Sequence, residues 1–236
     1  YLFVFESRKE KTMKTLKMLV AASAAVVLTF VGMTASAATV NLTMNSWGDL
    51  ATAVKNAAAG DTISVTPGTA DTTYQATSTI KISKSLTIVS ADNANRVKIS
   101  NSSNKVLAFE ISGSGTEVRF EKIDFSGSGV STAANPARGM IYSSAGKLRL
   151  SYCTFNGCTV GINDVIGIES AGAVTASGDL LRMNDCTFRY CRAVNHCAGS
   201  LGRQTAAPQC AGAVASIAKN TIVRRCPFVD NKAEGF

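Results

Sequence analysis

Cysteine is the residue type with the widest chemistry in this chain, and all seven cysteines lie after residue 150. The interval between Cys153 and Cys158 equals that between Cys186 and Cys191, which indicates matched structural positions. Thiols can pair as disulfides in an oxidising compartment, or they can ligate a metal. The odd total leaves at least one thiol without an intramolecular partner.

The only histidine, His196, lies close in sequence to three of these cysteines, so a metal site is an alternative to disulfides or free thiols. With Cys191, Cys197 and Cys210 it would complete a set of four zinc ligands. The segment lacks a Cys-x-x-Cys pair, and export favours oxidation of the thiols. We therefore expect a solvated histidine, no metal site and no cofactor.

The N-terminal segment carries targeting signals. Two lysines precede an uncharged apolar run, and Ala35-Ser36-Ala37 offers a small-x-small cleavage site. This pattern predicts a signal peptide over 13–37 and a mature domain over 38–236, because the run is short for a membrane anchor. Residues 1–12 are predicted to be translated upstream sequence.

Composition and charge exclude several classes of protein. With 46% hydrophobic and 17% charged residues, the chain is neither disordered nor a polytopic membrane protein. The formal net charge is +8, but no run of five like charges occurs and no nucleic-acid-binding motif is present. We expect a solvated basic surface and no nucleic-acid partner. A preference for anionic glycans or membranes is the alternative.

One short helix followed by short strands is the predicted order of elements. Ser46 can cap a helix over 46–59, and Gly60 suits a left-handed stop. After it, brief apolar segments such as 62–65 and 86–89 are bounded by Gly, Ser, Asn or Asp, as strands are. Amphipathic helices do not separate these segments, so a doubly wound α/β fold is not expected.

An internal repeat organises the second half of the chain. Three segments align without gaps, and in each a Gly is followed 14 residues later by a Cys, with a Phe two residues after that. The matched positions are Gly139, Gly172 and Gly212; Cys153, Cys186 and Cys226; and Phe155, Phe188 and Phe228. A weaker earlier copy contains Phe125 and places Ile111 where Ile141 falls.

A fixed core with variable length outside it indicates strands that must keep register. Stacking such units about 4.8 Å apart would give every strand two neighbours and a continuous apolar ladder. We expect Leu150, Met183 and Val223 to form one inner stack. The three repeat phenylalanines would form another or would pack at a corner. The repeat glycines would lie where the backbone bends or lacks room for a side chain.

These motifs resemble a known family. Gly-Ala-Val at 172–174 and 212–214, with Phe-x-x-Asn at 228–231, resembles the Gly-Gly-Ala-Ile and Phe-x-x-Asn repeats of bacterial polymorphic outer membrane proteins. The resemblance implies an all-β, right-handed, single-stranded parallel β-helix (a solenoid) of the pectin-lyase-like superfamily, with a short N-terminal capping helix. Cys158 and Cys191 depart from the pattern, since they stand where Asn231 stands in the last copy.

Stacked repeats would bring matched cysteines together. Equivalent positions in adjacent coils have Cα atoms near the disulfide range of about 4.4–6.8 Å. The candidate disulfides are Cys153–Cys186, Cys158–Cys191 and Cys197–Cys210. Buried free thiols are the alternative for the stacked residues.

Enzymes are common in the pectin-lyase-like superfamily, so the acidic residues are candidate catalytic groups. A polysaccharide lyase needs clustered carboxylates for calcium and a basic residue, and a glycoside hydrolase needs convergent carboxylates. Asp164 and Glu169 share one segment, and Asp185 could approach Arg182 and Arg192. Because a solvated face is the commoner origin of such groupings, we name no catalytic residue.

The expected role is an exported cell-surface or secreted interaction module, similar to an adhesin or an autotransporter passenger. Its ligand would be a glycan or another host-surface molecule. The chain stops directly after a repeat, which predicts C-terminal truncation and membrane attachment only through a missing anchor. A polysaccharide lyase or glycoside hydrolase is the alternative function, and a spacer that binds nothing is the third.

Overall fold

The computed structural model describes residues 36–101, 107–130, 139–144, 146–163, 170–196 and 210–235. The predicted upstream segment 1–12 and nearly all of the predicted signal peptide lie outside these residues. None of the described helices is long and apolar enough to span a membrane.

The described chain is mostly β-structure, with parallel strands in stacked sheets and one short helix. We call the three long sheets the first, second and third sheet. The first contains β1 (Thr39–Met44), β2 (Thr62–Pro67), β5 (Leu86–Ser90), β8 (Glu117–Glu121), β11 (Lys147–Ser151), β15 (Leu180–Asn184) and β20 (Asn220–Arg224), in that order.

The other two long sheets follow the same chain order. The second contains β4 (Ile80–Ile82), β7 (Phe109–Ile111), β10 (Ile141–Ser143), β14 (Val174–Ala176) and β19 (Val214–Ser216). The third contains β3 (Thr73–Gln75), β6 (Lys98–Ser100), β9 (Asp124–Val130), β12 (Thr154–Asn163), β16 (Thr187–Arg189) and β21 (Phe228–Val229), joined by β17 (Arg192–His196) and β22 (Lys232–Gly235). A small sheet pairs β13 (Ser170–Ala171) with β18 (Cys210–Ala211).

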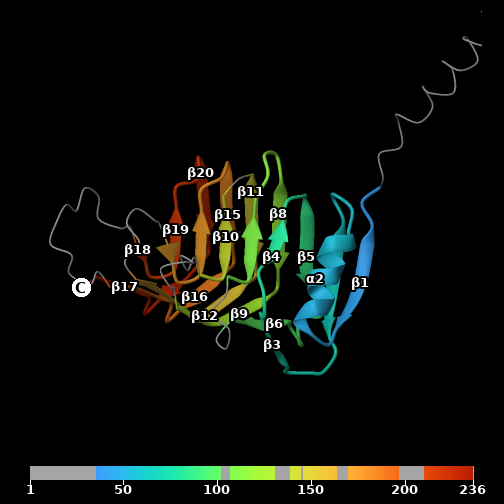
Figure 1. Cartoon of the computed structure of the whole chain (residues 1–236), viewed down its shortest axis with the longest axis horizontal. Helices are drawn as coiled ribbons and strands as arrows, with labels where there is room; N and C mark the ends of the chain where they lie inside the picture. The colour runs from blue at the N-terminus through green and yellow to red at the C-terminus, as the bar shows by residue number, and fades with distance from the viewer. Residues whose placement is uncertain are drawn as a thin grey trace, which may run out of the picture. The chain divides into compact units, whose positions relative to one another are not determined.

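From β4 onward the chain visits the second, first and third sheets in turn, then starts again one strand further along each sheet. We call each such passage a rung. All described pairings are parallel, as in β8 with β11 and β11 with β15. The succession of rungs can be followed through the colours of Figure 1.

The N-terminal helix, α2 (Trp47–Asn56), begins where the sequence predicts. The backbone N–H of Ser46 donates to the Asp49 carboxylate at 2.8 Å, so the first turn is capped. The helix ends at Asn56 rather than Ala59, because the Asp61 carboxylate accepts the N–H of Ala58 at 2.7 Å and holds it outside the helix.

Buried apolar residues of α2 join the same core as the sheets. Trp47, Leu50 and Val54 are buried, and the Trp47 ring lies edge-on to Phe109 of β7 with 5.4 Å between centroids. The helix therefore covers core side chains of the second sheet.

Side chains between the sheets form the ladders that the repeat predicts. Phe125, Phe155, Phe188 and Phe228 stack with centroid separations of 4.8 Å at each step. Leu150 pairs in register with Met183, and Met183 with Val223. The predicted inner stacks are confirmed.

The weaker early repeat is aligned differently from the prediction. Ile141 lies opposite Phe109, and Ile111 lies opposite Ser143, a shift of two residues. Five residues, 112–116, separate β7 from β8, whereas only three separate β10 from β11. An even shift keeps every side chain on its original face, so the core is preserved.

The repeat glycines lie where no side chain fits, as predicted. A Cβ on Gly172 would come within 2.3 Å of the Gly212 carbonyl oxygen and 2.4 Å of the Cys158 carbonyl oxygen. Gly139 and Gly212 meet neighbouring backbone in the same way. These positions therefore allow adjacent rungs to approach closely.

Candidate functional site

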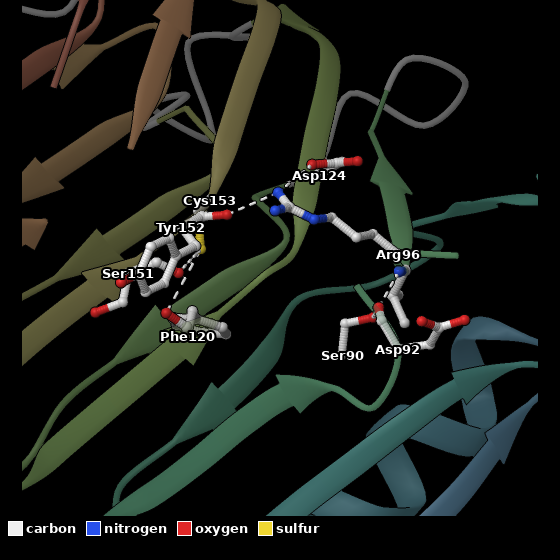
Figure 2. Close-up of polar contacts among 9 residues, drawn as sticks. Ser90, Asp92, Arg96, Phe120, Asp124, Ser151, Tyr152 and Cys153 are labelled. Atoms are coloured by element: carbon white, nitrogen blue, oxygen red, sulfur yellow. Dashed lines mark hydrogen bonds and ion pairs between the residues drawn. The ribbon is translucent and has the colours of Figure 1, made fainter. Parts of the chain in front are cut away.

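The turn between β5 and β6 carries Arg96, whose side chain reaches neighbouring strands of the third sheet. Ser90 Oγ accepts the N–H of Val97 at 3.1 Å, and Asp92 Oδ1 accepts the N–H of Ala94 at 2.9 Å. These side-chain-to-backbone bonds are typical of turns rich in Ser and Asp. They fix the turn from which Arg96 extends (Figure 2).

Arg96 joins three neighbouring strand segments. Its Nη1 donates to the Tyr152 carbonyl at 2.9 Å and lies 3.6 Å from Asp124 Oδ1 (Figure 2). Arg96 precedes β6, Asp124 begins β9 and Tyr152 precedes β12, which are successive strands of the third sheet. One guanidinium thus links three rungs.

A shallow polar groove of about 230 Å³ lies beside this contact. It is lined by Asp71, Asn93, Ala94, Asn95, Arg96, Lys98, Asp124 and Thr154. Among these lining residues, Lys98 Nζ lies 2.7 Å from Asp71 Oδ1, and this hydrogen bond holds the Asp71 pKa below its usual value.

The charged side chains that line the groove stand in pairs, Arg96 with Asp124 and Lys98 with Asp71. The hydrogen bond from Lys98 favours the ionised form of the Asp71 carboxylate. Within the described residues, no three His, Cys, Asp or Glu side chains are grouped so that they could hold a metal. The arrangement offers paired charges and amides to a polar ligand.

The cysteines stand in the two stacks that their spacing predicts. Thr187 N–H donates to the Cys153 carbonyl, which places Cys153 beside Cys186. Pairing of Thr159 with Arg192 places Cys158 beside Cys191 in the same way. All four are buried free thiols, and Cys226 is a half-buried free thiol.

Cys158 and Cys191 take over a hydrogen bond that asparagine makes in the last rung. Asn231 Nδ2 donates to the Phe188 carbonyl at 3.0 Å. One rung earlier, Cys191 Sγ donates to the Phe155 carbonyl at 3.7 Å, and Cys158 Sγ bonds to the Phe125 carbonyl at the same distance. The thiols therefore substitute for the side-chain amide at this corner.

Two of the stacked thiols, Cys158 and Cys186, are poor nucleophiles, whereas the hydrogen bond with Cys158 lowers the pKa of Cys191. Desolvation raises the pKa of Cys158 well above the usual thiol value, and the thiol is fully buried. For Cys186, the hydrogen bond with Cys153 raises the pKa, and burial adds to it. Since the thiolate is the reactive form, these groups serve packing.

The structure describes two of the three candidate disulfide pairs. Cys153–Cys186 and Cys158–Cys191 are neighbours in space but hold thiols in this structure. The Cys197–Cys210 pairing stays a prediction, because Cys197 lies outside the described residues and only the backbone of Cys210 is described, in β18. The side chain of His196 is not described either, which leaves the zinc alternative untested.

Asp185, which the sequence allowed to approach Arg182 and Arg192, forms an ion pair with Arg225. Asp185 pairs with Arg225 of the next rung, with 2.7 Å between Asp185 Oδ2 and Arg225 Nη2. Both residues occupy the same corner of successive rungs in the left-handed conformation, which brings them face to face. Arg182 therefore does not neutralise Asp185. Asp164 and Glu169 lie outside the described residues.

Sequence reasoning missed Arg96 and a row of arginines on the first sheet. Arg119, Arg149 and Arg182 are paired in register on three successive strands. Their signal was present, because each lies between two apolar residues at the same repeat position. Arg96 carries no such signal, since its partners lie far away in sequence and depend on the shape of a turn.

Comparisons with protein-family models, with curated proteins and with solved structures find no match to this chain.

Proposed function

We propose that this chain is an exported interaction module built on a right-handed, single-stranded parallel β-helix. It acts at the cell surface or in the medium, in the manner of an adhesin or autotransporter passenger, and it binds a glycan or another surface ligand. The proposal includes no catalytic site.

The observation that carries this proposal is the register of the rungs. Corresponding residues of three sheets stack strand upon strand, as in the pairing of Phe155 with Phe188 and Arg149 with Arg182. Because side chains alternate between the two faces of a strand, outward residues form rows along the stack. Rows of this kind are the binding surfaces of repeat proteins. A right-handed path is the rule for parallel crossover connections.

Export is supported by the sequence of residues 13–37, in which lysines, an apolar run and a small-residue cleavage site follow one another. The paired charges that line the groove support the binding of a polar ligand.

Expression of the chain from Met13 in an export-competent bacterium tests the proposal. We expect the protein outside the cytoplasm, with Ala38 as its first residue by N-terminal sequencing. We also expect it to bind at least one member of a glycan and host-matrix panel.

Two results would contradict the proposal. Retention in the cytoplasm with an intact N-terminus would remove the export claim. Calcium-dependent release of unsaturated products from a uronate polymer would show a lyase instead of a binding module.

A further inference from the structure

A row of arginines crosses the outward face of the first sheet. Arg119 of β8, Arg149 of β11 and Arg182 of β15 pair with one another in register. The strands stand side by side in Figure 1, and neighbouring strands are about 4.8 Å apart. We call these three residues the arginine row.

The face around the arginine row is positively charged. The outward residues of β8, β11, β15 and β20 include five basic and two acidic side chains. They are Lys147, Arg119, Arg149, Arg182 and Arg224, against Glu117 and Glu121. Like charges at this spacing repel one another, so a bound anion would relieve the repulsion between these side chains.

The acidic residues neutralise only one end of the row. Glu117 Oε1 lies 2.6 Å from Arg119 Nη2 and 2.8 Å from Arg149 Nε. These two arginines hold the Glu117 pKa below its usual value although burial opposes the shift. One carboxylate therefore serves two guanidinium groups, and the row retains excess positive charge.

The opposite end of the row lacks a partner. Within the described part of the chain, Arg182 makes no ion pair, and its buried Nε has no hydrogen-bond acceptor. The buried Oδ1 of Asn184, two residues along the same outward face, also lacks a donor. The positive charge of Arg182 is therefore not neutralised by any described carboxylate, and a nearby anionic group would stabilise this end of the row.

The shape of the row selects the ligand. Three guanidinium groups in a line fit a linear chain of anions, and each planar group matches a carboxylate or sulfate with two hydrogen bonds. Arg149 keeps only 27% of its side chain exposed, which a thin chain reaches more readily than a flat membrane does. The outward face of these four strands contains no aromatic residue on which nucleic-acid bases could stack.

We propose that the arginine row binds an acidic polysaccharide along the stack of rungs, with Arg149 and Arg182 as its main contacts. This inference rests on the proposed function and names the class of ligand. The anionic groups are carboxylates or sulfate esters, which the arginine row would bind through the same chemistry.

Binding of the purified, exported chain to heparin, polygalacturonate and neutral dextran tests this. Arg182→Gln is expected to weaken binding to the acidic polymers about tenfold, in line with loss of a charge-assisted hydrogen bond. Lys81→Gln is the matched control, because Lys81 lies on the second sheet and its side chain is 77% exposed. It removes the same charge and should change the affinity less than about twofold.

A second variant guards against a folding defect. Asn184→Asp places a carboxylate beside Arg182 on the same face, which should neutralise that end without removing a packed side chain. We expect unchanged or raised thermal stability together with weakened heparin binding. Raised salt should weaken the wild-type affinity as well, because exposed charges are screened.

The outcomes separate this inference from the proposed function. Binding of only one acidic polymer supports the inference and identifies the anion as sulfate or carboxylate. Equal losses in Arg182→Gln and Lys81→Gln, no preference over dextran, or equal binding of oligo-dT or anionic vesicles would overturn it. An exported chain that binds another ligand but no acidic polymer would retain the proposed function alone.

Discussion

At the residue scale, the close approach of adjacent rungs depends on positions that tolerate no side chain. Gly172 is the clearest case, because backbone oxygens of two neighbouring segments surround the site of its missing Cβ. The sequence predicted this role from the repeat alone. It could not predict Arg96, whose partner Tyr152 is 56 residues away and is reached only through the shape of a turn.

We predict that Gly172→Ala destabilises the chain by about 3 kcal/mol, since backbone must move to admit the methyl group. Gly48→Ala is the matched control. Gly48 lies in α2 with only an ordinary contact near its Cβ position, and alanine should stabilise the helix by up to about 1 kcal/mol. Urea unfolding measures both changes, and equal effects would refute the packing explanation.

The buried thiols predict a pH dependence of stability. Folding raises the pKa of Cys186, so the folded state keeps a proton that the unfolded state releases above about pH 8.5. This contribution to the free energy of unfolding is therefore complete below that pH and declines as the pH rises further. We expect Cys186→Ala to show a shallower decline between pH 8 and pH 10 in urea unfolding.

The same titration separates thiols from disulfides. A protein with Cys153–Cys186 and Cys158–Cys191 bonds has no thiol to ionise at these positions, so it would show no decline from this source. Mass spectrometry after alkylation in denaturant gives an independent count of free thiols.

At the element scale, the repeat predicted which strands pair and which residues face the core. The register of Leu150 with Met183 follows directly from the gap-free alignment. The early copy was misaligned by two residues, because the longer turn at 112–116 leaves no trace in the apolar pattern. The end of α2 was misplaced because Asp61, outside the helix, captures the N–H of Ala58.

The phenylalanine ladder predicts unequal effects along one row. Phe155 is fully buried between Phe125 and Phe188, so Phe155→Ala should lower the free energy of unfolding by about 3–5 kcal/mol. Phe228 is 48% exposed and stacks on one ring only, and Phe228→Ala should cost less than half as much. Similar losses in chemical denaturation would show that the rungs do not stack in this order.

At the scale of the whole molecule, residues at one repeat position form a row across neighbouring strands. The alignment that stacks Phe155 on Phe188 inside the core also aligns Arg149 with Arg182 outside it. The sequence indicated a basic surface without locating it, because a row appears only once the register is known. The uneven placement of Glu117, which serves two arginines and leaves Arg182 without a partner among the described residues, is likewise a property of the assembled face.

A crystal structure of the exported chain with a short heparin oligosaccharide is the most direct test that stacked rungs build an anion-binding surface. We predict parallel rungs that pair Phe155 with Phe188 and Arg149 with Arg182, with sulfate groups contacting the guanidinium groups of these two arginines. A different register, or an oligosaccharide bound away from the outward face of the first sheet, would contradict the central claim.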